Sequence, residues 1–70
     1  MMPLTLADNG EELIIRRVGG LPEVKRHLED LGFVVGESVR IISRIGGNVI
    51  VVVKDTRLAI DQTMAEKIMV

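Results

Sequence analysis

The chain has 70 residues, of which 47% are hydrophobic, with a net charge of −1 and no cysteine. This length suffices for one small folded domain over residues 1–70, and the lack of cysteine excludes disulfides, thiolate metal sites and cysteine nucleophiles. A near-neutral charge and a single aromatic residue, Phe33, argue against nucleic-acid binding, which needs a basic face and, for single strands, aromatic platforms.

No part of the sequence predicts a membrane segment or an export signal. The longest apolar run, Val49–Val53, is far shorter than the roughly 20 residues that a membrane helix needs. Residues 1–12 carry neither a basic region nor a long apolar stretch, as a signal peptide would. We therefore expect a cytoplasmic protein without direct membrane insertion.

The N-terminal part predicts extended structure. Leu4–Leu6 reads as a short extended piece, and Asp8-Asn9-Gly10 reads as a turn, because Asn and Gly tolerate left-handed dihedral angles. The segment Glu12–Val18 is rich in β-branched residues and is bounded by turn signals, which predicts a strand ending at Gly19-Gly20.

A helix follows from Pro22, which suits the first helical position because its missing N–H is no loss there. The helix has an apolar stripe at helical spacing, made of Leu21, Val24, Leu28 and Leu31.

The helix is expected to end at Gly32, in the left-handed position that stops a helix. Phe33 then packs on Leu28, so the only aromatic residue has a structural role. Gly36 forms a turn with Glu37, and the two glycines make an abrupt corner from helix to strand.

The rest of the chain predicts short antiparallel strands. Gly46-Gly47-Asn48 is a hairpin signal, and Thr63 and Glu66 have the spacing of a capping box at the start of one helical turn. A mainly β fold with one short helix, closing into a partly open barrel, would limit the exposed strand edges. The expected strands are Val39–Ile45, Val49–Val53, Arg57–Asp61 and a closing segment, Ile68–Val70.

The segment Arg26–Val39, RHLEDLGFVVGESV, is similar to the R-x-L-x-x-(L/M)-G-(hydrophobic)-x-x-G-x-x-V corner of the FeoA family. Leu58-Ala59-Ile60 and Ala65–Val70 resemble the family's last strand, helical turn and closing strand. Two places depart from the family pattern: Ile45–Asn48 replaces a hairpin that often contains proline, and Asp61 stands where an arginine is common.

The resemblance implies a small SH3-like barrel of about five strands, with the helix between the first and second strands and one helical turn before the last. It also implies an accessory or regulatory protein of bacterial ferrous iron uptake, whose partner is FeoB, a membrane transporter with a cytosolic GTP-binding domain. No enzymatic activity comes with this family. The same domain occurs fused to metal-dependent repressors, so the fold alone does not fix the role.

A partner surface is expected on the outer side of the central hairpin. We predict a three-residue loop, Gly46–Asn48, because a two-residue loop would place Lys54 inside the sheet opposite Val39. An apolar strip with a basic rim would suit a protein contact, unless the N-terminal segment or the helix covers it. The predicted partner surface consists of Arg40, Ile42, Arg44, Ile50 and Val52, with Ile45 facing inward opposite Val49.

Two further classes of function remain as alternatives. Glu23, His27 and Asp30 lie at i, i+4 and i+7 of the helix, so they could bind Fe²⁺ or another divalent metal weakly; we expect no other cofactor. A generic SH3-like peptide-binding or oligomerising module is the other, although a single aromatic argues against a groove for proline-rich peptides. We expect no enzyme, because His27 lies among exposed charges and no hydroxyl residue has an evident base.

Overall fold

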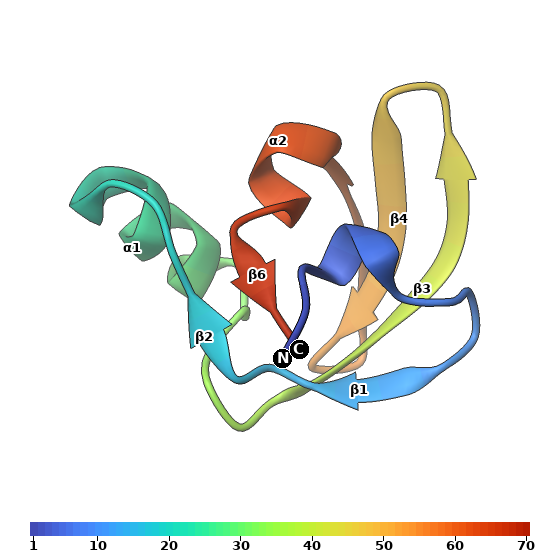
Figure 1. Cartoon of the computed structure of the whole chain (residues 1–70), viewed down its shortest axis with the longest axis horizontal. Coiled ribbons are helices and arrows are strands. Elements are labelled where there is room, and N and C mark those ends of the chain that lie inside the picture. The colour runs from blue at the N-terminus through green and yellow to red at the C-terminus, as the bar shows by residue number, and fades with distance from the viewer.

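A computed structural model describes residues 1–70. Strands β1, β3, β4 and β5 form an antiparallel sheet in the order β1-β3-β4-β5, and β2 pairs with β6 (Figure 1). The helix before the central strands and the helical turn before the last strand are present, as expected. In chain order the elements are η1 (Leu4–Leu6), β1 (Glu12–Ile14), β2 (Arg17–Val18), α1 (Pro22–Asp30), β3 (Ser38–Ile45), β4 (Asn48–Val53), β5 (Thr56–Asp61), α2 (Gln62–Ala65) and β6 (Ile68–Met69).

One hydrophobic cluster joins these elements, and no polar or charged side chain is buried. Burying apolar surface contributes about 25 cal/mol per Å², so this cluster is the main source of stability. Phe33 and Leu28 from the helix corner lie in it with alternate residues of the strands. The buried residues are Leu4, Ala7, Ile15, Val18, Leu28, Phe33, Val39, Ile41, Val49, Val51, Val53, Ile60, Ala65, Ile68 and Val70.

The predicted strand Glu12–Val18 is divided into β1 and β2, which corrects the expectation of one continuous strand. β1 pairs with β3 and β2 pairs with β6, so the chain passes from one sheet to the other at the buried residue Ile15. The Ile15 N–H donates to the Glu37 carbonyl, and the Ile15 carbonyl accepts from the Gly36 N–H, both at 2.8 Å. Gly36 has φ +96°, a conformation that suits glycine, so the predicted corner glycine positions this crossing.

The first residues also differ from the expectation: Leu4–Leu6 is a 3₁₀ helix and not an extended piece. The Leu6 N–H donates to the Pro3 carbonyl at 3.0 Å, and this tight turn puts Leu4 wholly in the core. Met2 and Val70 exchange two backbone hydrogen bonds of 2.9 and 2.8 Å, so the two ends of the chain lie together (Figure 1).

The end of α1 confirms the predicted glycine stop. Gly32 has φ +112°, its N–H donates to the Glu29 carbonyl, and the Phe33 N–H donates to the Leu28 carbonyl, both at 3.0 Å. These are the two bonds of a Schellman motif, and Phe33 and Leu28 are both fully buried.

The predicted apolar stripe of α1 is only half correct. Leu28 is buried and Val24 is partly buried, but Leu21 and Leu31 are 74% and 38% exposed. Leu21 is the extended residue before the helix and Leu31 is the residue that caps its end, so neither lies on a regular helical face.

The register of the β3–β4 hairpin corrects the prediction. The loop has two residues, Gly46-Gly47, with Ile45 opposite Asn48. Lys54 nevertheless does not lie on the inner face opposite Val39. A β-bulge between Ile41 and Ser43 shifts the register by one residue, so that Val39 pairs with Val53.

The α2 turn begins differently from the expected capping box. Asp61 is the N-cap, and its carboxylate Oδ1 accepts a 2.7 Å hydrogen bond from the Met64 N–H, so Thr63 lies inside the helix. None of the helices is both long and apolar enough to span a bilayer.

Candidate protein-interaction surface

Strands β3 and β4 present an apolar strip on the side of the sheet that faces away from the core. Val49, Val51 and Val53 are buried, so the side chains that alternate with them point outward. On β3 the register places Arg40 opposite Val52, Ser43 opposite Ile50 and Ile45 opposite Asn48 on this outer side. The bulge residue Ile42 has no pairing partner and is partly exposed beside them. We call this surface the outer hairpin face; it consists of Arg40, Ile42, Ile45, Ile50 and Val52.

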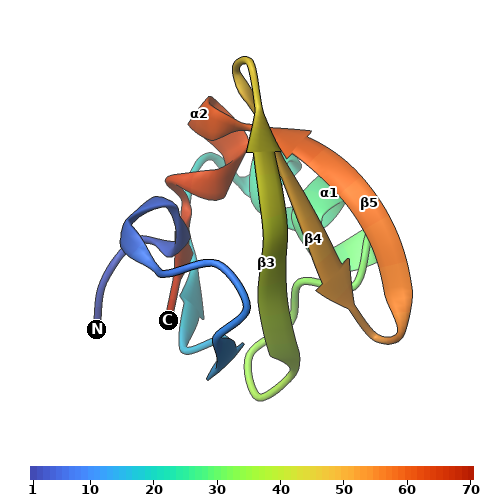
Figure 2. The ribbon, with the colours of Figure 1, turned by 90° about the vertical axis from the view of Figure 1, so that its right-hand side faces the viewer.

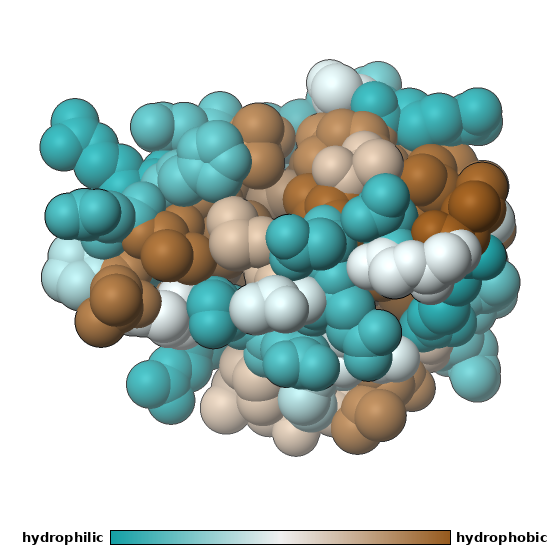
Figure 3. Space-filling model, turned by 90° about the horizontal axis from the view of Figure 1, so that it is seen from above, coloured by the Kyte–Doolittle hydropathy of each residue, from teal (hydrophilic) through white to brown (hydrophobic).

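Ile45 is the most exposed apolar member of this face, with 65% of its surface open to solvent. Figure 2 looks onto β3 and β4 from this side, with α1 behind them. Seen from above in Figure 3, hydrophobic side chains gather at the right, over the end of the molecule where the hairpin rises. Nothing in the chain folds over Ile45, so it is open to a partner.

The sequence prediction placed Ile45 inward, and the register explains the error. With Gly46-Gly47 as a two-residue loop, Ile45 lies opposite the exposed Asn48 and not opposite the buried Val49. Gly46 has φ +59° and Gly47 does not have a positive φ, which is the pattern of a type II′ turn. The Gly-Gly pair is a signal for such a two-residue turn and could have located Ile45 on the outer face.

Arg44 does not belong to the outer hairpin face, which corrects a second part of the predicted surface. It lies opposite the buried Val49, on the inner side, where its guanidinium donates to the Asn9 side chain at 2.8 Å. It also donates to the backbone carbonyls of Ala7 at 2.7 Å and Thr5 at 3.1 Å. Arg44 therefore connects the hairpin to the N-terminal segment, and four of the five predicted residues stay on the outer face.

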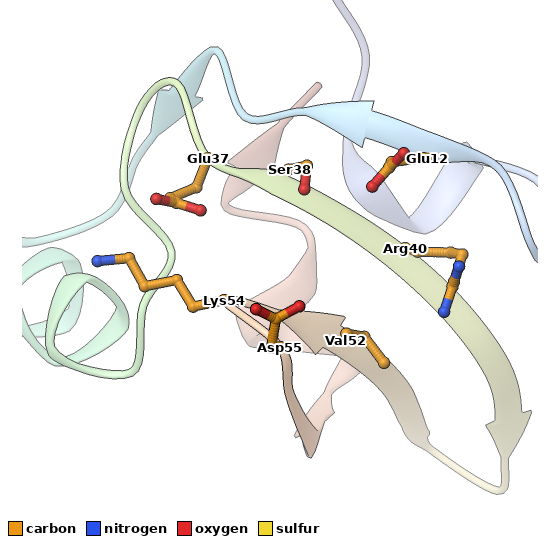
Figure 4. Close-up of a pocket in the computed structure, with 7 residues that line it drawn as sticks. All are labelled: Glu12, Glu37, Ser38, Arg40, Val52, Lys54 and Asp55. Carbon is orange, nitrogen blue, oxygen red and sulfur yellow. The ribbon is translucent and has the colours of Figure 1, made fainter.

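A charged pocket of about 210 Å³ adjoins the outer hairpin face and shares Arg40 and Val52 with it. Figure 4 shows that its side chains come from β1, the start of β3 and the end of β4 with the turn after it. The Glu12 and Asp55 carboxylates lie on opposite sides of the pocket, and Lys54 extends toward Glu37 (Figure 4). The lining residues are Glu12, Glu37, Ser38, Arg40, Val52, Lys54 and Asp55. Charges of both signs suit a polar peptide segment better than a small apolar ligand.

The turn at the edge of this pocket has an unfavourable backbone. Lys54 and Asp55 have φ +50° and +60°, which costs an ordinary L-residue roughly 1–2 kcal/mol, although aspartate tolerates it better. Asn-Gly would adopt this type I′ turn more easily. Lys54 and Asp55 thus place two charged side chains at the pocket, although Asn-Gly would form a more stable turn at these positions.

The predicted metal residues lie on the exposed side of α1. Glu23, His27 and Asp30 are all exposed, and the structure brings no three His, Asp or Glu side chains into a group that could hold a metal ion. The helix spacing therefore gives three separate solvated groups in this conformation.

The order of the strands and the position of the helical turn define a small mainly β protein with a partly open barrel. The FeoA domain model matches residues 2–70, and the chain therefore belongs to the FeoA domain family.

Individual relatives agree with this assignment. A protein of Methanocaldococcus jannaschii that is provisionally named Fe(2+) transport protein A is 33% identical over 70 residues, which cover 100% of this chain and 85% of that protein. The crystal structure of Stenotrophomonas maltophilia FeoA in complex with zinc, described as an SH3 domain protein, superposes with a TM-score of 0.87 at 28% identity. The match covers 99% of this chain and 88% of that one.

The solution structure of FeoA from Chlorobium tepidum gives the same TM-score, 0.87, at 27% identity, covering 97% of this chain and 67% of that one. The predicted SH3-like fold is confirmed by these superpositions.

Proposed function

We propose that this chain is an accessory protein of ferrous iron uptake that binds the cytosolic part of a FeoB-type membrane transporter, and that it acts through this contact without an enzymatic reaction of its own. Membership of the FeoA domain family supports the role in ferrous iron transport. The M. jannaschii relative carries a name for Fe(2+) transport, and the S. maltophilia relative is described as a candidate activating factor of ferrous iron transport.

The contact that we propose is the outer hairpin face. The observation that carries it is the exposure of Ile45 at the end of an apolar strip, because an exposed isoleucine gains free energy when a partner buries it. Arg40 lies beside the strip with Glu12 of β1 opposite it, and Arg57 of β5 lies opposite Val52, so the strip has a charged rim. An apolar centre with charged surroundings is the usual arrangement of a protein interface.

The acidic and basic side chains of the neighbouring pocket would orient the partner. Charged groups at the edge of an interface contribute more to the association rate and to register than to affinity. The partner segment is therefore expected to carry an apolar residue for the strip and charged residues for the pocket.

An NMR titration of the isotope-labelled chain with the isolated cytosolic domain of the transporter tests this proposal. The titration is run with a GTP analogue, with GDP and without nucleotide, because a regulatory contact should depend on the nucleotide state. We expect saturable shifts at the amides of Arg40, Ile42, Ile45, Ile50 and Val52. Shifts confined to α1 would reject the surface and keep the partner, and no shift in any nucleotide state would reject both.

A further inference from the structure

The free edge of β5 is the one long strand edge of this sheet that has no partner. The sheet order is β1-β3-β4-β5, and β5 pairs only with β4 along its six residues. Figure 2 shows β5 at the right-hand border of the sheet, with α1 behind it and not beside its outer edge. An uncovered edge strand offers a row of unpaired N–H and carbonyl groups.

The register identifies which residues direct these groups outward. The turn Lys54-Asp55 has two residues, and in such a hairpin the flanking pair, Val53 and Thr56, exchanges two hydrogen bonds, as does every second pair after it. The Gln62 N–H, which donates to the Gly47 carbonyl at 3.0 Å, continues this alternation. The backbone groups of Arg57, Ala59 and Asp61 therefore point away from β4.

The side chains of the same three residues are exposed on the outer side of the sheet, and they form a self-complementary set. Arg57 and Asp61 are equally far from Ala59 along the strand and have opposite charges. An antiparallel pair of identical strands with a two-fold axis at Ala59 places each Arg57 directly opposite the partner's Asp61. The small side chain of Ala59 lets the two strands approach at the axis.

We propose that a second copy of this chain pairs with the free edge of β5 in this register, so that two four-stranded sheets join into one continuous sheet. The charge complementarity of Arg57 and Asp61 selects a second copy as the occupant, since charges on an edge strand otherwise deter pairing. On the inner side, the register places the partly buried Leu58 opposite the partner's Ile60, so the apolar layer also continues across the axis.

Directly opposite ions of opposite sign stabilise a strand pair by roughly 0.2–1 kcal/mol each, and this pair occurs twice in the dimer. The Oδ1 of Asp61 already accepts from the Met64 N–H, which leaves its other carboxylate oxygen for Arg57. A contact along one short edge is small, so the dimer is expected to be weak and concentration-dependent. The proposal does not depend on the transporter contact, although Arg57 also lies at the rim of the outer hairpin face.

Sedimentation equilibrium and NMR on the full chain, from micromolar to millimolar concentration, test the association. We expect a monomer–dimer equilibrium in which the amides of Arg57, Ala59 and Asp61 shift with concentration. In a mixture of isotope-labelled and unlabelled protein, the register predicts an intermolecular contact between the Hα atoms of Leu58 and the partner's Ile60. A monomer at millimolar concentration, or association through other residues, would overturn the proposal. If the edge binds a strand of a different protein instead, the chain alone will be monomeric.

Three variants test whether the association uses this strand edge or is nonspecific. Ala59→Pro removes the N–H at the axis, which β4 does not use, so the fold should remain and the dimer should be lost. Arg57→Glu should weaken association roughly tenfold or more, because two attractive pairs become repulsive. Arg26→Glu, the same charge change on the exposed side of α1, should leave association unchanged; an equal loss in both charge variants would contradict the register.

A mixing experiment remains decisive if Ala59→Pro does not fold. Arg57→Glu makes the edge acidic, and Asp61→Lys makes it basic, so neither variant should associate with itself. Together they restore two oppositely charged pairs, and the mixture should form a heterodimer. Asp61→Lys loses the N-cap of α2, so its fold is checked first by its amide spectrum. Two folded variants that fail to associate in the mixture would exclude the proposed pairing.

Discussion

The guanidinium of Arg44 donates a 2.8 Å hydrogen bond to the Asn9 side chain, across 35 positions of the sequence. It also donates to the carbonyls of Thr5, which belongs to η1, and of Ala7, which follows η1. One side chain of the hairpin thus binds three polar acceptors of the N-terminal segment and connects this segment to β3.

Arg44→Ala should lower the free energy of unfolding by about 1–2 kcal/mol, because hydrogen bonds from a charged donor to three acceptors are lost. Arg44→Lys should restore little of this, since an ammonium group lacks the planar fork that reaches several acceptors at once. Urea denaturation measures both changes. Equal stability of Arg44→Ala and the original chain would show that the contact contributes nothing.

The two kinds of glycine in this chain give a second prediction. Gly32→Ala should destabilise the protein by about 1–2 kcal/mol, because its φ of +112° is unfavourable for alanine. A Cβ there would meet neighbours no closer than 3.6 Å, so the cost is backbone strain and not a clash. Gly47→Ala is the matched control, since Gly47 lacks a positive φ and has open space around it; we expect no loss and up to about 1 kcal/mol of gain. Equal losses in the two variants, measured by urea denaturation, would contradict this account.

The turn between β4 and β5 should be more stable with a different sequence. The double variant Lys54→Asn, Asp55→Gly should raise the free energy of unfolding by about 1 kcal/mol, because both residues adopt left-handed conformations. The same variant removes two charges from the pocket, so its association with the transporter domain should be slower. A stopped-flow measurement that finds unchanged association, together with the higher stability, would remove the pocket from the interface.

The predicted metal residues on α1 can be tested directly. Anaerobic calorimetry with Fe²⁺ should give no saturable heat from Glu23, His27 and Asp30, because the structure does not bring such groups together. His27→Ala should therefore give the same heat on titration with Fe²⁺ as the original chain. A saturable heat that His27→Ala abolishes would show that α1 does hold a metal ion.

Local signals in the sequence were sufficient where the contacts themselves are local. The corner from Leu28 to Phe33 was predicted to the residue, since a helix that ends in a Schellman motif is decided by a glycine and its two neighbours. The strands Val49–Val53 and Arg57–Asp61 were also found, because turn signals bound both.

The errors come from interactions between distant segments. The bulge after Ile41 has no local signal in the sequence. Without it, a two-residue loop would place Lys54 on the inner face opposite Val39, and for this reason the correct loop was rejected. Arg44 was placed on the outer face because its acceptors lie at the other end of the sequence. Leu4 forms part of a 3₁₀ turn whose stability comes from burial in a core that the rest of the chain supplies.

The measurement that tests the proposed function most directly compares two exposed apolar residues on different surfaces. Ile45→Glu changes the outer hairpin face and Leu21→Glu changes the start of α1, at 65% and 74% exposure respectively, so neither should disturb the core. Calorimetry with the cytosolic domain of the transporter should show binding at least about tenfold weaker for Ile45→Glu, the size of a moderate interface residue, and unchanged for Leu21→Glu. Equal affinities of both variants and the original chain would contradict the proposed contact.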